Sequence, residues 1–170
     1  RRMQVNRIDL YQVHEWDGET PLEETLAALD ALVQSGKVRY VGISNYCGWQ
    51  TAWGGAWQQA FPGRAPLLAS QMEYSLLQRG IEREVLPALQ QAGAGVLAWS
   101  PLGRGVLTGK YRTGTPSDSR AASEHFADFV RPFLDDRSHQ IVEAVVTAAS
   151  GLGVAPLEVA LAWVRDRPGV

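Results

Sequence analysis

Side chains with hydrogen-bonding groups or an aromatic ring lie at the carboxyl ends of four short apolar runs. They are His14 on the first run, Ser44 and Asn45 on the second, Gln71 and Glu73 on the third, and Trp99 and Ser100 on the fourth. An imidazole can hydrogen-bond a carbonyl oxygen and stabilise developing charge, while Asn and Gln amides offer donors and acceptors together. Taken singly, each also fits a plainer role, as a satisfied strand-end histidine, a helix N-cap or a core tryptophan.

The elements that would position these side chains alternate regularly along the chain. Four apolar runs predict buried strands at Ile8–His14, Lys37–Ser44, Leu67–Tyr74 and Val96–Ser100. Helical patterns are expected over about residues 20–36, 45–59, 81–92, 136–150 and 156–166. A repeat of roughly 30 residues is the βαβ rhythm of a parallel α/β sheet, either doubly wound or closed into a (β/α)8 barrel.

Local patterns refine the first two helices and one long connection. Thr20 is the expected N-cap of the first helix, with Pro21 at its first position and Glu23 completing a capping box. Three tryptophans recur every four residues on the second helix, namely Trp49, Trp53 and Trp57. This spacing places them on one face and predicts packing rather than binding. The segment from Gly103 to about Val130 is too long for a plain connector and is expected to be a functional loop.

Known glycine motifs for nucleotide binding narrow the choice of fold and function. No Gly-x-Gly-x-x-Gly sequence lies between a strand and a helix, so the Rossmann fingerprint is missing. Gly109 and Lys110 match the end of a P-loop, but Arg104 replaces its first glycine and Tyr111 its Ser or Thr, which excludes a nucleotide triphosphatase. Polar strand ends fit a barrel, whose active site is built at that edge, although four strands cannot close one.

Composition excludes several classes of partner. The 170 residues include 16 Lys and Arg against 18 Asp and Glu, a net charge of −2 that gives no general attraction to nucleic acid or an anionic membrane. Cys47 is the single cysteine, and no apolar run reaches the roughly 18 residues of a membrane span, so a reducing, cytoplasmic location is expected. His125 and His139 have no ligand-like spacing with Cys47, so no metal site is expected.

Four segments together resemble successive strand ends of the aldo-keto reductases. The closest resemblance is to the branch that includes the potassium-channel β subunits. The segments are RIDLYQVHEWD from Arg7, GKVRYVGISNY from Gly36, QMEYSLLQR from Gln71 and WSPLGRGVLTGKY from Trp99. The resemblance implies a (β/α)8 TIM barrel that binds NADP(H) in extended form and reduces a small aldehyde or ketone to an alcohol.

The resemblance also assigns roles to individual residues. His14 matches the family's catalytic histidine, and Ser44, Asn45 and Gln71 match the residues that hold the nicotinamide carboxamide. Trp99 matches the aromatic side chain on which the nicotinamide stacks. A loop over the cofactor pyrophosphate is matched by Ser100, Pro101, Leu102, Gly103, Arg104 and Lys110, in which Arg104 and Lys110 can add positive charge.

The resemblance further implies that residues 1–170 form a partial barrel domain, about strands four to seven with their helices. The chain opens on Arg1 rather than methionine and closes on Arg167 to Val170, a helix stop. The family's catalytic Asp, Tyr and Lys would precede Arg1, and the motif that distinguishes NADP from NAD would follow Val170. The chain alone is therefore expected to be unstable and inactive. A nicotinamide-binding regulatory subunit of the channel β type and a nonfunctional truncated remnant are the alternatives; channel subunits tend to carry Asn at the position of His14.

Overall fold

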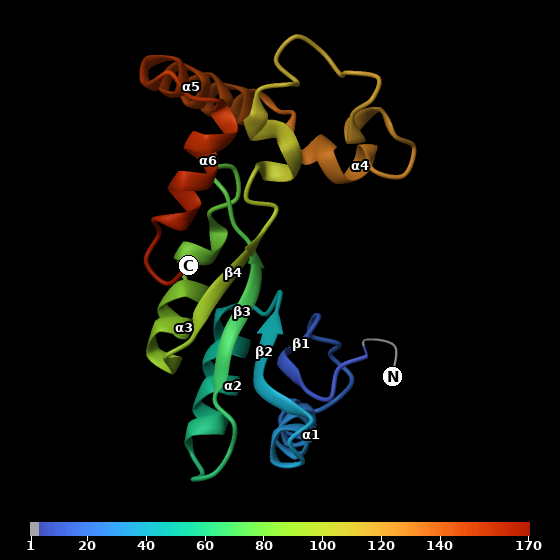
Figure 1. The fold of residues 1–170 in the computed structure, drawn as a ribbon, viewed down its shortest axis with the longest axis vertical. Helices are drawn as coiled ribbons and strands as arrows, with labels where there is room; N and C mark the ends of the chain where they lie inside the picture. Colours follow the sequence, from blue (N-terminus) through green and yellow to red (C-terminus); the bar gives the residue numbers. More distant parts are fainter. Residues whose placement is uncertain (1–3) are drawn as a thin grey trace. The chain divides into compact units, whose positions relative to one another are not determined.

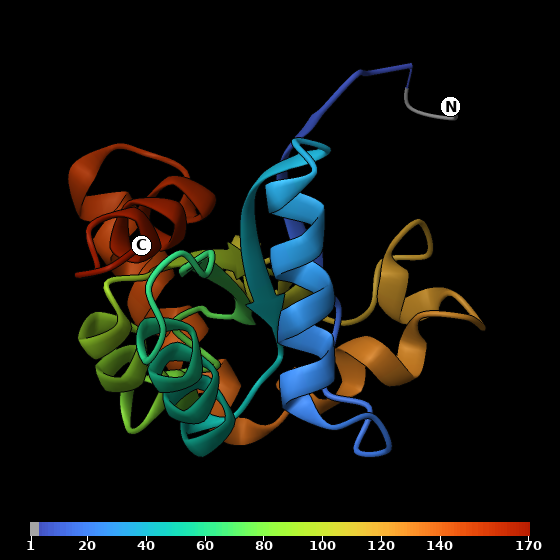
Figure 2. The ribbon, with the colours of Figure 1, turned by 90° about the horizontal axis from the view of Figure 1, so that it is seen from below.

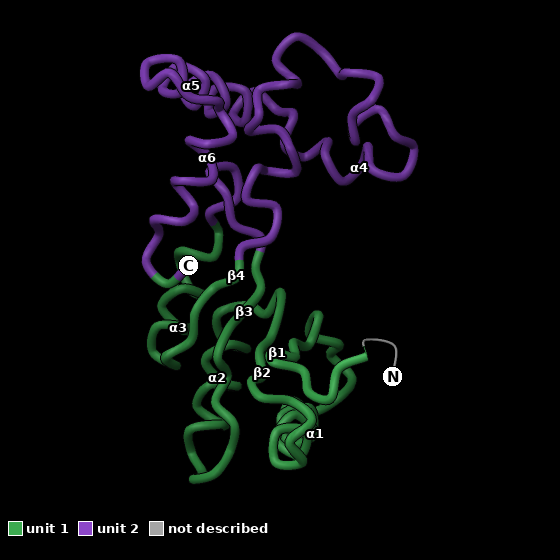
Figure 3. Tube along the Cα trace, viewed as in Figure 1, with its two compact units in different colours: residues 1–72, 80–97, 169 green, residues 73–79, 98–168, 170 purple. Residues whose placement is uncertain are grey.

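The computed structural model describes residues 4–170; residues 1–3, including the opening Arg1 and Arg2, lie outside the described part. The chain divides into two compact units (Figure 3). Unit 1 contains the chain up to residue 72, residues 80–97 and Gly169. Unit 2 contains residues 73–79, residues 98–168 and Val170.

The four expected strands are confirmed, with ends that differ by a residue from the predicted ones (Figure 1). The strands are β1 (Ile8–Val13), β2 (Val38–Ser44), β3 (Leu67–Glu73) and β4 (Gly95–Trp99). The α-helices are α1 (Leu22–Gln34), α2 (Gly48–Gln59), α3 (Val85–Ala92), α4 (Ala127–Val130), α5 (Asp136–Leu152) and α6 (Pro156–Arg165). Short 3₁₀ helices are η1 (Gly80–Glu82), η2 (Gly103–Thr108), η3 (Arg120–Ala122) and η4 (Arg131–Phe133). The predicted long loop therefore contains short helical turns.

The strands form one sheet in the order β1-β2-β3-β4. β1 pairs with β2 in parallel, and β2 pairs with β3 in parallel with a register shift between Val41 and Gly42. At Gly42 the backbones approach so closely that an added Cβ would lie 2.5 Å from the carbonyl oxygen of Ala69. Because parallel strands share one direction, the carboxyl ends of β1, β2 and β3 meet at one edge.

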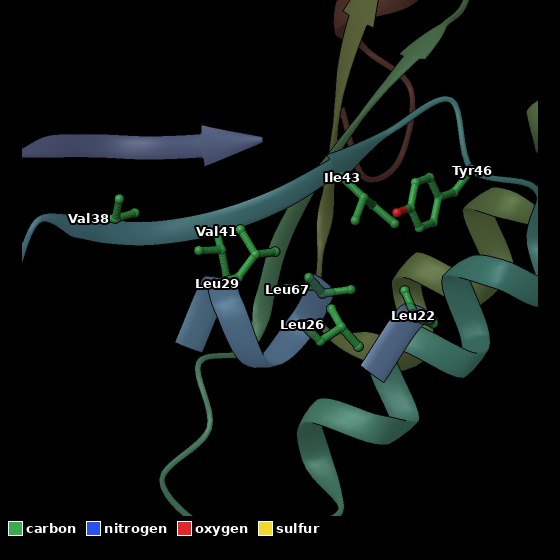
Figure 4. Packing of buried hydrophobic residues seen from close by; sticks show 8 residues of the cluster. All are labelled: Leu22, Leu26, Leu29, Val38, Val41, Ile43, Tyr46 and Leu67. Carbon is green, nitrogen blue, oxygen red and sulfur yellow. The ribbon is translucent and has the colours of Figure 1, made fainter. Parts of the chain in front are cut away.

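Helices α1, α2 and α3 link successive strands and form a layer in unit 1, where α1 packs on β2 and α2, and α2 packs on α3. Figure 2 shows α1 running beside β2. The core between this layer and the sheet consists of Leu22, Leu26, Leu29, Val38, Val41, Ile43, Tyr46 and Leu67 (Figure 4). Burying a leucine of this kind stabilises the fold by about 1.5–3 kcal/mol.

Unit 2 has its own core, built from η2, α4, η4, α5 and α6 and the turn after β3. Its buried members are Leu77, Val106, Leu107, Val130, Phe133, Val142, Val145 and Ala160. The helix α5 begins at the N-cap Asp135, whose carboxylate accepts a hydrogen bond from the Ser138 amide at 2.8 Å. Over residues 4–170 no single helix has the length and hydropathy to cross a membrane, although α5 and α6 reach both when joined across their 101° bend.

Three predicted helix starts were wrong. α3 begins at Val85 rather than near Ile81, which lies in η1; the other two are those of α1 and α2. Asp17 accepts hydrogen bonds from the amides of Glu19 and Thr20, so Thr20 belongs to the preceding turn, and α1 has Pro21 as its N-cap without a side-chain cap. Asn45 has a φ of 59° and lies outside α2, which begins at Gly48. Such left-handed backbone is one that Asn tolerates better than most residues.

The predicted tryptophan packing on α2 reaches the core only for Trp57, while the Trp49 ring contacts those of Trp16 and Trp53. Trp57 packs against the core of unit 1, whereas Trp49 and Trp53 are 56% and 43% exposed. The buried side of α2 instead carries Gly54, which faces Leu67, and Gly55, which faces Ala92. Because glycines allow close helix packing, it is the glycines rather than most of the tryptophans that face the neighbouring elements.

Candidate functional site

In unit 1 the structure brings the four predicted residues at the ends of β1, β2 and β3 into one hydrogen-bonded group. The Asn45 side-chain amide donates to the carbonyl oxygen of His14 at 3.1 Å. The Gln71 carbonyl oxygen accepts the Ser44 hydroxyl at 2.8 Å and the Asn45 backbone amide at 3.1 Å. These bonds link three neighbouring strands at their shared carboxyl edge.

Burial divides this group into supporting and accessible residues. Ser44 is only 2% exposed and Gln71 is half-buried, whereas His14 and Asn45 are exposed. The Ser44 hydroxyl donates its hydrogen bond to the Gln71 backbone, and its oxygen can still accept a hydrogen bond. The accessible side chains are thus an imidazole and an amide, which can donate to a carbonyl oxygen and accept from an amide group.

Tyr46 follows this group in the sequence, but its phenol is buried and not accessible to a ligand. It is 3% exposed within the core of unit 1, and its ring meets Trp16 edge-on at 5.4 Å between centroids. Burial, and secondarily the charge of Asp17, raise the pKa of the Tyr46 hydroxyl above its ordinary value. Tyr46 is therefore a protonated core residue rather than an exposed proton donor.

In unit 2, the predicted cofactor loop continues directly from the end of β4. Trp99 ends the strand, and Ser100, Pro101 and Leu102 form a half-buried turn before η2. The loop contains five residues with left-handed backbone, which are Ser100, Gly103, Arg104, Gly105 and Gly109. At buried Gly103 a Cβ would lie 2.7 Å from the Leu77 side chain, so this turn requires glycine both for its φ and for its packing.

Lys110 and Gly105 are the part of this loop that best fits a phosphate group. Lys110 is exposed, and a Cβ added at Gly105 would lie 3.5 Å from its Nζ, so the ammonium lies beside bare backbone. The missing side chain at Gly105 lets a ligand approach the backbone closely, and the ammonium supplies the charge that a phosphate needs. Lys110 beside Gly105 could therefore hold a phosphate group.

The position of Arg104 in the loop suggested a cation available to a phosphate, but its guanidinium is already engaged. Its Nε and Nη2 donate to the two carboxylate oxygens of Glu73, each at 2.7 Å, and its Nη1 donates to the carbonyl oxygen of Phe129. Trp99 stacks with Phe129 at 6.4 Å between centroids and 16° between planes. Phe129 is a site neighbour that the sequence did not identify, and the pairing of the strand-end residue Glu73 with Arg104 was not predicted either. Both partners lie far from Arg104 in the chain, Glu73 by 31 residues and Phe129 by 25.

Within residues 4–170, no group of three or more His, Cys, Asp or Glu side chains converges as metal ligands would. Cys47 lies at the N-cap of α2, where its backbone amide donates to the Gln50 side chain at 2.8 Å. Its local role is therefore to begin a helix.

Comparisons with known proteins match the chain to one family. The model of the Aldo/keto reductase family matches residues 1–170. The uncharacterized oxidoreductase YrpG of Bacillus subtilis is 39% identical over 99% of this chain and 49% of its own length. A probable voltage-gated potassium channel subunit beta of Arabidopsis thaliana is 35% identical over all of this chain and 52% of its own length.

A third relative carries a substrate in its name. The L-glyceraldehyde 3-phosphate reductase of Escherichia coli O157:H7 is 42% identical over 73% of this chain and 36% of its own length. The chain spans about half the length of the first two relatives.

Proposed function

The chain belongs to the aldo/keto reductase family, and from that premise we propose that it forms the nicotinamide-binding part of an NADP(H)-dependent reductase of small aldehydes or ketones. The observation that carries the proposal is the hydrogen-bonded group at the ends of β1, β2 and β3. It presents an imidazole beside amide groups at the edge of a parallel sheet, where barrel enzymes build their sites.

His14 is the proposed catalytic residue of this chain. Its exposed imidazole can donate a hydrogen bond to a substrate carbonyl oxygen and stabilise the negative charge that develops there. Asn45 holds the His14 carbonyl oxygen and so fixes the backbone from which the imidazole projects. His14 therefore orients the substrate on a strand end that is itself tied to its neighbour.

Asn45, Gln71 and Ser44 are the proposed holders of the nicotinamide carboxamide. The cofactor, when bound, would supply the hydride for carbonyl reduction. A carboxamide needs both donors and acceptors, and Asn and Gln amides provide them in a fixed orientation. The bonds from the Ser44 hydroxyl and the Asn45 backbone amide to the Gln71 backbone carbonyl oxygen hold the backbones from which these side chains project.

The remaining proposed contacts lie in unit 2. Trp99 offers an aromatic face for stacking, while the turn Ser100 to Gly103 and Lys110 would receive the pyrophosphate. The four parallel strands would correspond to about strands four to seven of a (β/α)8 barrel. The family's catalytic Tyr, Asp and Lys are then contributed by other parts of the complete protein.

A direct assay tests the proposed activity. The complete protein, mixed with NADPH and a small aldehyde such as glyceraldehyde, should consume NADPH at a rate that saturates with aldehyde concentration. A panel of small aldehydes and ketones that all leave NADPH unchanged would overturn the proposed reaction.

A regulatory subunit of the channel β type is the second candidate, because a probable channel subunit is 35% identical over the whole chain. A subunit of this kind would bind the cofactor without needing rapid turnover of a substrate. Saturable NADP(H) binding without aldehyde reduction, together with co-purification of a channel-like membrane protein, would favour it over the reductase.

A further inference from the structure

Arg104 and Glu73 form a nearly buried ion pair in unit 2. The guanidinium bonds the carboxylate through two parallel contacts of 2.7 Å, with the side chains only 15% and 12% exposed. Such a bidentate pair fixes the position and the plane of both groups. It links the first residues of the loop after β4 to the end of β3.

The same guanidinium also holds the segment Ala127–Phe133. It donates to the Phe129 carbonyl oxygen and lies 4.0 Å from the Phe129 ring centre and 4.8 Å from that of Phe133. The Phe129 ring in turn stacks with Trp99. One side chain therefore joins the strand end, the loop and the aromatic surface around Trp99.

The charge and backbone of Arg104 argue against a direct role at a phosphate. Three of its five N–H groups are engaged, and the Glu73 carboxylate offsets its charge. Its φ is 58°, a left-handed conformation that glycine adopts at lower cost. The contacts of the Arg104 side chain explain why arginine, rather than glycine, occupies this position.

We propose that Arg104 is a positioning residue that, through Glu73 and Phe129, fastens the segment Ala127–Phe133 and the surface around Trp99 in the form that binds the nicotinamide cofactor. This inference rests on the proposed function for its cofactor and on the geometry of unit 2 for its fastening role. Lys110, which lies beside Gly105, remains the cation of the loop that meets a phosphate.

Two substitutions in the complete protein separate positioning from direct contact. Glu73→Gln should weaken NADP(H) binding about tenfold, since charged hydrogen bonds of this kind contribute a factor of roughly ten or more. Arg104→Lys should weaken it comparably, because an ammonium cannot make the bidentate pair. A double variant should be no worse than either single one. If Arg104 instead binds phosphate, Glu73→Gln should leave the affinity unchanged or raise it, and that result would overturn the proposal.

Trypsin cleavage at Arg120 in cofactor-free protein tests the fastening role without any ligand. Both variants should be cut at least about fivefold faster, because loss of the pair raises the population of the opened segment. Arg131→Gln is the matched control, since it removes a positive charge from the same segment but breaks only an exposed pair with Asp128. Its cleavage rate at Arg120 should equal that of the unmodified protein.

The outcomes distinguish this inference from the proposed function. Unchanged cleavage in both variants would overturn the fastening role whether or not the protein binds NADP(H). Faster cleavage with unchanged NADP(H) affinity would show a purely structural role and overturn the link to the cofactor. If the unmodified protein binds no NADP(H), the proposed function fails and the link to the cofactor with it, and the cleavage rates still decide the fastening role.

Discussion

At the strand ends, a single residue can hold neighbouring strands together and still be exposed. Asn45 shows this most clearly, because its left-handed backbone turns the chain away from β2 while its side chain and amide bind the ends of β1 and β3. Ser44 fills the buried place beside it. The exposed imidazole of His14 thus projects from a backbone whose carbonyl oxygen is held by Asn45.

His14→Asn is the sharpest test of a single residue. We expect kcat for aldehyde reduction by the complete protein to fall about 100- to 1,000-fold, the loss typical of one donor to a developing oxyanion. The dissociation constant for NADPH should change little, because the proposed partner of His14 is the substrate carbonyl and not the cofactor. Equal losses in kcat and in NADPH affinity would contradict the assigned role.

Elements of unit 1 are joined by a buried polar contact as well as by the apolar core. Asp30 of α1 is 7% exposed and accepts hydrogen bonds from the Gln58 side chain of α2 at 2.9 Å and the Ala65 amide at 2.8 Å. One carboxylate therefore ties α1 to α2 and to the segment that leads into β3. Breaking it leaves two donors buried without this acceptor.

Asp30→Ala should lower the free energy of unfolding by about 2–4 kcal/mol, the cost of leaving those two donors unsatisfied. Asp30→Asn retains an acceptor oxygen and should cost about 1 kcal/mol or less. Urea unfolding of the complete protein measures both. An Asn variant as unstable as the Ala variant would show that charge, rather than hydrogen bonding, is what matters at Asp30.

The start of α2 depends on close packing at Gly48. A Cβ there would overlap the Cβ of Glu84, so Gly48→Ala should destabilise the protein by about 1–3 kcal/mol through overpacking. Gly151→Ala in α5 is the matched control, because nothing lies within 4 Å of its added methyl group and helix propensity should raise stability by about 0.5–1 kcal/mol. Thermal unfolding that shifts both variants in the same direction would refute the packing argument.

At the scale of the whole molecule, the sheet ends in two outer strands, β1 and β4. Tyr11 on β1 and Leu97 on β4 are large apolar side chains that are exposed, at 42% and 43%. Val96 of β4 donates to the Gly169 carbonyl oxygen, which occupies one backbone group of that strand. Outer strands with exposed apolar side chains favour association with another chain.

The 170-residue chain expressed by itself should therefore self-associate. Light scattering should give a mass well above the 18.6 kDa of one chain, and added aldehyde should not accelerate NADPH consumption. A monomer that unfolds cooperatively and reduces an aldehyde would contradict this expectation.

The sequence was informative where short-range patterns decide the structure. Apolar runs bounded by turns predicted all four strands, and two of the polar residues at their ends, Ser44 and Asn45, bond through their side chains to the backbone of neighbouring strand ends. It failed where partners lie far apart in the chain. Nothing in the local pattern joins Arg104 to Glu73, and the burial of Gly54 and Gly55 on α2 depends on Leu67 and Ala92.

The central claim is that this chain carries the binding surface for a nicotinamide cofactor, and titration of tryptophan fluorescence tests it most directly. NADPH added to the complete protein should quench the fluorescence to a saturating limit. Trp99→Phe should lose most of that change, whereas Trp53→Phe, an exposed residue of α2, should retain it. No saturable quenching in the unmodified protein, or equal quenching in both variants, would contradict the claim.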